Sequence, residues 1–108
     1  MKEDVLAFIK HFQNEGTIKT FTNGCCYWFA KILEQRYFWH GGAKIYYNPI
    51  DNHFVCEVGG YFYDITGVIP YNDNLVAWDY YQRIEPLDGF RVEMNCIQMN
   101  DKYDMDRH

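Results

Sequence analysis

The sequence lacks any segment that would carry the chain into a membrane or across one. None of its apolar runs approaches the ~20 residues that a membrane span needs. The N-terminal stretch 1–5 carries acidic residues and has no apolar core of the kind found in signal peptides. We therefore expect a cytoplasmic protein with no membrane partner.

Positive charge is also scarce. The chain has 10 Lys and Arg residues against 15 Asp and Glu residues, which gives a formal net charge of -5, and no local cluster of Lys and Arg occurs. A nucleic-acid interface needs a basic surface. We therefore expect no nucleic-acid partner.

The four cysteines have neither the spacing of a disulfide framework nor that of a zinc site. Cys25 and Cys26 are adjacent, Cys56 and Cys96 are isolated, and there is no Cys-x-x-Cys pair. His53 and Cys56 have opposite parity on one expected strand, so they would point to opposite faces of a sheet. The sequence thus predicts reduced thiols, no metal ion and no cofactor.

No linker, composition shift or internal repeat divides the chain. Hydrophobic residues make up 48% of its 108 residues, which is enough for one core and excludes a disordered chain. We expect a single domain over 1–108. The polar end, about 100–108, is expected to be flexible.

Hydrophobic periodicity predicts an α+β domain. The expected bounds are 2–14 and 24–38 for helices, and 43–47, 53–58, 61–65 and 90–99 for strands. Residues 68–74 are expected to form a loop, and 75–84 fit a helix or a strand equally. Because a sheet is the only large partner for the helices, we expect the N-terminal helices to pack on an antiparallel β-sheet.

Two glycines, Gly59 and Gly60, separate two alternating runs and predict a tight hairpin, since its turn needs positive φ. If they form the whole loop, counting back along both strands places Val55 opposite Asp64, with His53 two residues further on. His53 and Asp64 then share a face as diagonal neighbours, roughly 7–8 Å apart at the backbone. A carboxylate beside an imidazole fixes its tautomer and stabilises the imidazolium, as in a catalytic triad.

Cys25 and Cys26 lie in the first turn expected of the second helix. Unpaired backbone N–H groups and the positive end of the helix dipole favour a thiolate there. Counting about 100° per residue puts Cys25 near the centre of the buried stripe and Cys26 near its edge, where it can face a cleft. Asn23, with Thr22, is a candidate N-cap, and Asn23 is also a candidate oxyanion donor.

Three segments together resemble the core of the papain-like superfamily, most nearly its transglutaminase-like branch and the NlpC-type cell-wall peptidases. These segments are 24–30 (Gly-Cys-Cys-Tyr-Trp-Phe-Ala), 53–58 (His-Phe-Val-Cys-Glu-Val) and 63–67 (Tyr-Asp-Ile-Thr-Gly). They also resemble small bacterial and phage proteins with a Cys-His-Asp triad. The resemblance covers roughly the middle half of the chain.

The resemblance implies a small papain-like core with Cys26 as nucleophile, His53 as base and Asp64 as the orienting acid. The aromatic residue that follows the nucleophile in these proteins is Tyr27 here. Tyr27 and Trp28 are therefore candidates for the cleft around the thiol.

Two functions are compatible with these residues. The first is a thiol enzyme of acyl transfer (amide hydrolysis, deamidation or transamidation) with a peptide or protein substrate. The second is a non-catalytic module that binds a protein partner, for example a phage-type inhibitor on the same scaffold, because a chain of 108 residues has little room for a substrate domain.

Overall fold

The computed structural model describes residues 2–13, 26–39 and 42–103, the side chains of 97–103 excepted. The helices are α1 (Lys2–Phe12), α3 (Cys26–Tyr37), α4 (Trp78–Ile84) and α5 (Pro86–Tyr103). The strands are β1 (Ala43–Asn48), β2 (His53–Val58), β3 (Tyr61–Asp64), β4 (Gly67–Ile69) and β5 (Val76–Ala77). The predicted α+β class is confirmed.

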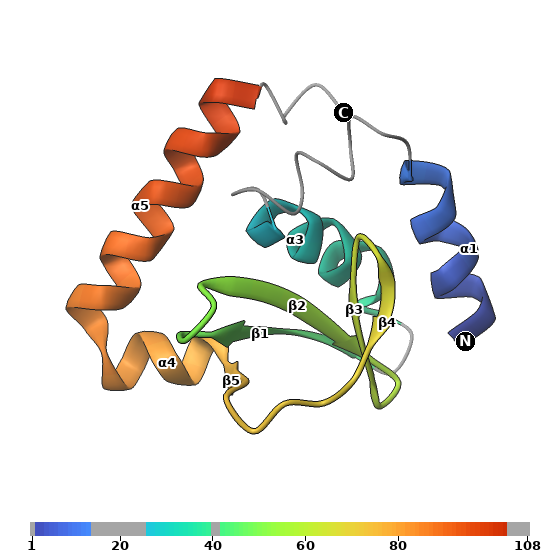
Figure 1. Cartoon of the computed structure of the whole chain (residues 1–108), viewed down its shortest axis with the longest axis horizontal. Coiled ribbons are helices and arrows are strands. Elements are labelled where there is room, and N and C mark those ends of the chain that lie inside the picture. The colour runs from blue at the N-terminus through green and yellow to red at the C-terminus, as the bar shows by residue number, and fades with distance from the viewer. Residues whose placement is uncertain (1, 14–25, 40–41, 104–108) are drawn as a thin grey trace.

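The strands form one five-stranded sheet in the order β4-β3-β2-β1-β5, with every neighbouring pair antiparallel. Helix α3 lies against one face, mainly on β1 and β2, and α1 and α5 flank α3 on either side (Figure 1). The prediction of N-terminal helices packed on an antiparallel sheet is therefore confirmed.

Helix α3 packs on the sheet because its apolar residues recur at helical spacing. Phe29 and Leu33 are fully buried against sheet residues such as Ile45 and Val58. Helix α1 does not cover the sheet to the same extent and packs beside α3, where the Phe12 and Phe29 rings meet edge to face at 5.8 Å. Burial of this interface fixes α3, and with it the position of its first residue.

The hairpin between β2 and β3 has the predicted register. Gly59 and Gly60 have φ angles of 60° and 90°, so both adopt the left-handed conformation that the two-residue turn requires. Cα pairing runs Val58↔Tyr61, Glu57↔Phe62 and Cys56↔Tyr63. The third strand ends at Asp64, one residue before the predicted end, and a turn leads into β4.

The predicted strand over 90–99 is wrong, because this segment lies within helix α5. Its apolar residues alternate with polar ones, which fits a strand, but the helix presents them on two sides. Val92 and Cys96 are 3% and 7% exposed, whereas Phe90 and Met94 are 67% and 39% exposed. Packing against α3 decides the outcome, because Val92 and Cys96 share one face of a helix.

Other boundaries differ by a few residues. The first predicted helix ends at Phe12 instead of Asn14, and the loop predicted over 68–74 begins with part of β4. The segment 75–84 contains both alternatives left open, β5 and then α4. The end predicted to be flexible from residue 100 continues α5 as far as Tyr103. Residues 104–108 lie outside the described residues, as do the predicted caps Thr22 and Asn23.

Candidate active site

The site forms where β2 and β3 separate. The ladder between them stops at Cys56↔Tyr63. In an antiparallel ladder alternate residues bond to the same neighbour, so Phe54 is the next residue of β2 whose N–H points toward the side of β3. The residue that would face it, Ile65, has turned away, and its carbonyl accepts a hydrogen bond from the Gln13 side chain at 2.8 Å. The backbone of Phe54 is therefore left for another acceptor.

Cys26 provides that acceptor. The Phe54 N–H donates to the Cys26 Sγ at 3.4 Å across 28 residues of sequence. Cys26 is the first residue of α3, so the docking of α3 on β2 delivers its sulfur to the gap in the ladder. The residue is 8% exposed.

His53 connects the thiol to a carboxylate. Its Nε2 lies 3.1 Å from the Asp64 Oδ2, which confirms that the two residues are neighbours across the hairpin. The Cys26 thiol is a second hydrogen-bonding partner of the same imidazole. Because Nε2 faces Asp64, Nδ1 is the ring nitrogen that remains for the sulfur.

Asp64 is held from its other side by the turn that follows it. Its Oδ1 accepts a hydrogen bond from the Thr66 backbone N–H at 2.8 Å and another from the Thr66 hydroxyl. Each carboxylate oxygen therefore has its own partner residue, and the orientation of the carboxylate toward His53 is fixed. The sequence assigns no role to Thr66, although an Asp side chain commonly accepts a hydrogen bond from the backbone two residues further on, as Asp64 does here.

These contacts favour the charged forms of His53 and Asp64. The hydrogen bond to Asp64, and then the one to Cys26, raise the pKa of His53 from 6.5 to about 10 against the opposing effect of burial. Burial alone would raise the pKa of Asp64, but hydrogen bonds from His53 and Thr66 outweigh it and lower that pKa below its ordinary value. His53 is therefore an imidazolium at neutral pH, with Asp64 as its counter-ion.

The side chains of the cleft candidates Tyr27 and Trp28 pack against other elements: Tyr27 against β2 and α4, and Trp28 against α5. The Trp28 Nε1–H donates to the Cys96 carbonyl of α5 at 2.6 Å. The Tyr27 ring packs 4.9 Å from that of Phe54, and its hydroxyl is a hydrogen-bonding partner of Trp78. Both residues belong to the first turn of α3 as the structure describes it. Asn23 lies outside the described residues.

The remaining thiols in the described part of the chain have no comparable setting. Cys56 is fully buried, and burial raises its pKa to about 12, so it stays a neutral core thiol. Cys96 faces α3 and is 7% exposed. Among the described residues, no cluster of three or more His, Cys, Asp or Glu side chains could hold a metal ion.

The fold and site define a small α+β protein with a hydrogen-bonded Cys-His-Asp series at the start of a helix. A family model described as phage YunG-like protein matches residues 5–105, and the chain therefore belongs to this family of small phage-type proteins. No curated protein and no solved structure matches the chain. Within the ranges described, no helix combines the length and apolar character needed to cross a membrane.

Proposed function

We propose that this chain is a cysteine-dependent acyl-transfer enzyme that acts on an amide bond of a peptide or protein. The observation that supports this most is the series Cys26–His53–Asp64, drawn from α3, β2 and β3 and joined by hydrogen bonds. A thiol that only fills a core needs no charged imidazole beside it. The resemblance to papain-like peptidases supports the same assignment of roles.

The first step forms a thioester. The Cys26 thiolate attacks the carbonyl carbon of the amide, and the oxygen becomes an oxyanion that N–H groups at the start of α3 can stabilise. The His53 imidazolium gives its proton to the leaving nitrogen as the carbon–nitrogen bond breaks. A free amine departs, the acyl group stays on Sγ, and Asp64 keeps the now neutral ring oriented.

The second step returns the enzyme to its starting state. A water molecule or an amine attacks the thioester, and His53 accepts the proton that the attacking group loses. The carbon–sulfur bond breaks, and Cys26 leaves as a thiolate beside a restored imidazolium. Peptide hydrolysis, deamidation and transamidation share these steps and differ only in the leaving and attacking groups.

The chemistry and the burial of Cys26 bear on where the protein would act and on how a substrate would reach the sulfur. Its sulfur must stay reduced to act, which fits a cytoplasmic location. The residue is 8% exposed, so a substrate carbonyl must reach a largely buried sulfur.

Selective alkylation tests the site. We expect iodoacetamide at neutral pH to label Cys26 at least about tenfold faster than Cys56 or Cys96, because the thiolate is the reactive form and N–H donors stabilise it. His53→Ala should remove most of this advantage, and Asp64→Asn part of it. Cys25→Ser is the matched control and should leave the labelling rate of Cys26 unchanged. Peptide mapping by mass spectrometry measures each rate, and equal labelling of all cysteines in the native protein would refute a reactive site.

An activity measurement then separates the three outcomes. Peptide mixtures are incubated with the protein in H₂¹⁸O, with and without a biotinylated primary amine. New carboxyl ends containing ¹⁸O indicate hydrolysis, ¹⁸O at glutamine side chains indicates deamidation, and biotin on the peptides indicates transamidation. Cys26→Ser, checked for native circular dichroism, should abolish whichever product forms. If the thiol is reactive and no product forms with any mixture, the function is not acyl transfer.

A further inference from the structure

Strand β2 has a pairing strand on only one side at the end that carries His53. Its ladder with β3 stops at Cys56↔Tyr63, whereas its ladder with β1 continues to Asn48↔His53. Among the described residues, β1 is therefore the only strand that pairs with residues 53–55. The position of the His53 backbone depends on the last pair of that one ladder.

The partner of His53 in this last pair is Asn48, which is 5% exposed. Of the Asn, Gln, Thr, His and charged residues that the structure describes, Asn48 alone is buried. Burying an amide costs free energy unless the protein replaces the hydrogen bonds that water would make. The contacts of the Asn48 side chain therefore show which part of the chain this burial stabilises.

The Asn48 side chain closes the turn between β1 and β2. Its Oδ1 accepts hydrogen bonds from the backbone N–H groups of Ile50 at 3.0 Å and Asp51 at 3.2 Å. Its Nδ2 donates to the Asp51 Oδ2 at 3.2 Å. An Asn that accepts from the backbone two and three residues further on takes the place of the bonds of a backbone turn. The amide thus fixes residues 49–52, which lead directly into His53.

A second contact holds the far end of the same turn. Asn52 has a φ of 51°, in the left-handed region that Asn tolerates better than most residues. Its Oδ1 accepts a hydrogen bond from the Tyr47 hydroxyl at 2.7 Å. The Tyr47 side chain is 2% exposed, and its ring packs 4.6 Å from that of Phe54. The residue before His53 and the residue after it therefore contact the same buried tyrosine.

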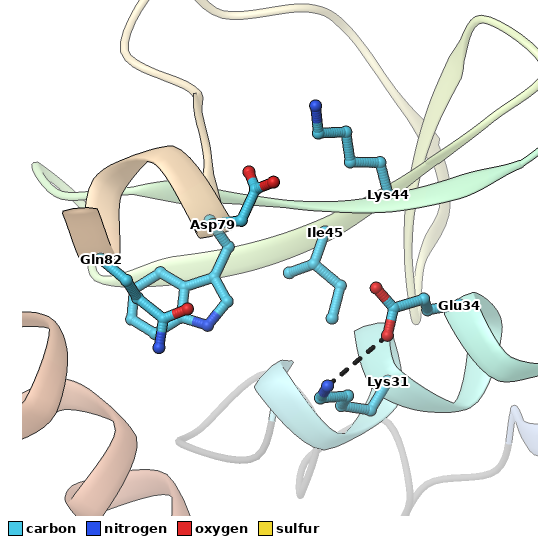
Figure 2. Close-up of a pocket in the computed structure, with 7 residues that line it drawn as sticks. Lys31, Glu34, Lys44, Ile45, Asp79 and Gln82 are labelled. Atoms are coloured by element: carbon cyan, nitrogen blue, oxygen red, sulfur yellow. Dashed lines mark ion pairs between the residues drawn. The ribbon is translucent and has the colours of Figure 1, made fainter.

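Strand β1 is itself anchored at the end that leads into this turn. Strand β5 pairs with it at Tyr46↔Ala77 and Tyr47↔Val76. Farther from the turn, no described strand pairs with β1 on that side, and a pocket of about 200 Å³ lies there, with Ile45 between α3 and α4 (Figure 2). The part of β1 with a strand on both sides is thus the part that Asn48 joins to the turn.

We propose that Asn48 is a positioning residue for His53. Its side chain holds the turn that sets the last pair of β1 and β2, and so keeps the imidazole directed at Asp64 and Cys26. It acts through the backbone of the turn and not through contact with the ring. The role of His53 as the base rests on the proposed function, but the position of its ring can be measured without turnover.

NMR titration of the His53 ring in the folded protein tests this role. With Asn48→Ala, we expect His53 to bind its proton about tenfold more weakly than in the wild type, because its contact with Asp64 loosens. Asn48→Ser keeps a hydroxyl that can accept from the turn and should give an intermediate result. Asn72→Ala is the matched control: Asn72 accepts from the Asn74 N–H in the loop between β4 and β5, and its removal should leave the titration unchanged.

Alkylation separates a displaced histidine from a loss of fold. In Asn48→Ala, we expect Cys26 to lose most of its labelling advantage with iodoacetamide, while the rates of Cys56 and Cys96 stay unchanged. Unfolding would instead expose Cys56 and Cys96 and speed their labelling. If Asn48→Ala unfolds in this way, the titration of Asn48→Ser decides.

A folded Asn48→Ala protein in which His53 titrates like the wild type overturns the proposal. An equal change in the Asn72→Ala control overturns it as well, because the effect would then not depend on the turn before His53. If Cys26 of the wild type labels no faster than Cys56, the proposed function fails, and the His53 titration still decides the role of Asn48.

Discussion

The Asp64 carboxylate is oriented toward one residue, His53, by its hydrogen bonds to another residue, Thr66. Its Oδ2 faces the His53 ring, and its Oδ1 is occupied by the Thr66 N–H and hydroxyl. Without those donors the carboxylate could rotate about its side-chain bonds and lose the alignment with the imidazole. Thr66 is therefore a positioning residue that acts on His53 through Asp64.

Thr66→Val tests this role, because it removes the hydroxyl and keeps both the shape and the backbone N–H. We expect the pKa of Asp64 to rise toward its ordinary value, since one donor to the carboxylate is lost. The cost in stability should be at most about 1 kcal/mol, because the contact is exposed. Thr66→Ser keeps the hydroxyl and should titrate like the wild type. NMR titration of the Asp64 carboxyl carbon measures the change, and identical curves for the Val and Ser variants would exclude the role.

The contact between His53 and Asp64 could be predicted by counting residues along the hairpin. The two are only 11 positions apart in the sequence, and two glycines fix the register of the strands that carry them. The position of Cys26 could not, since it depends on how α3 docks 28 residues away in sequence. The helix phase favoured the edge of the buried stripe, but the gap in the ladder that receives the sulfur arises from the early turn after Asp64. Local sequence patterns do not show how two segments that are far apart in the sequence, such as the start of α3 and the start of β2, pack against each other.

At the level of elements, the main error of the sequence-based prediction is the strand expected over 90–99, which lies within helix α5. The error has a physical cause. Apolar residues at alternate positions usually line one face of a strand. In α5 they form two stripes instead. Val92 and Cys96 face α3, while Leu87, Phe90 and Met94 face outward. The sequence shows that such residues are apolar but not that two helix faces divide them, because the division depends on contact with α3.

A pair of substitutions in α5 checks this arrangement. Val92→Ala should lower the free energy of unfolding by about 1–3 kcal/mol, since Val92 is 3% exposed and its removal leaves a cavity. Phe90→Ala should change it by no more than about 0.5 kcal/mol, because that ring is 67% exposed. In a strand the two residues would share a face and respond alike. Urea unfolding of both variants distinguishes the cases, and equal losses would contradict the helix.

For the whole molecule, the site links protonation to folding, because its three residues come from elements that are separate in the unfolded chain. His53 binds its proton more tightly in the folded state, with a pKa of about 10 against 6.5. Its contribution to stability is therefore complete below pH 6.5 and is lost as the pH rises through about 10. Asp64 behaves in the opposite sense: its contribution is present above its unfolded pKa of 3.8 and is lost as the pH falls through its lowered folded value.

Stability should accordingly be highest between about pH 3.8 and pH 6.5, where both contributions are present. It should decline toward alkaline pH as His53 loses its proton. We expect the advantage of the wild type over His53→Gln, measured by urea unfolding, to shrink as the pH is raised from below 6.5 to about 10. The matched control is His11→Gln, which changes an exposed histidine of α1 and should keep the alkaline slope of the wild type. Should His53→Gln show the same alkaline slope as the wild type, His53 would not be charged in the folded protein. The imidazolium on which the proposed proton transfer to the leaving amine depends would then be absent.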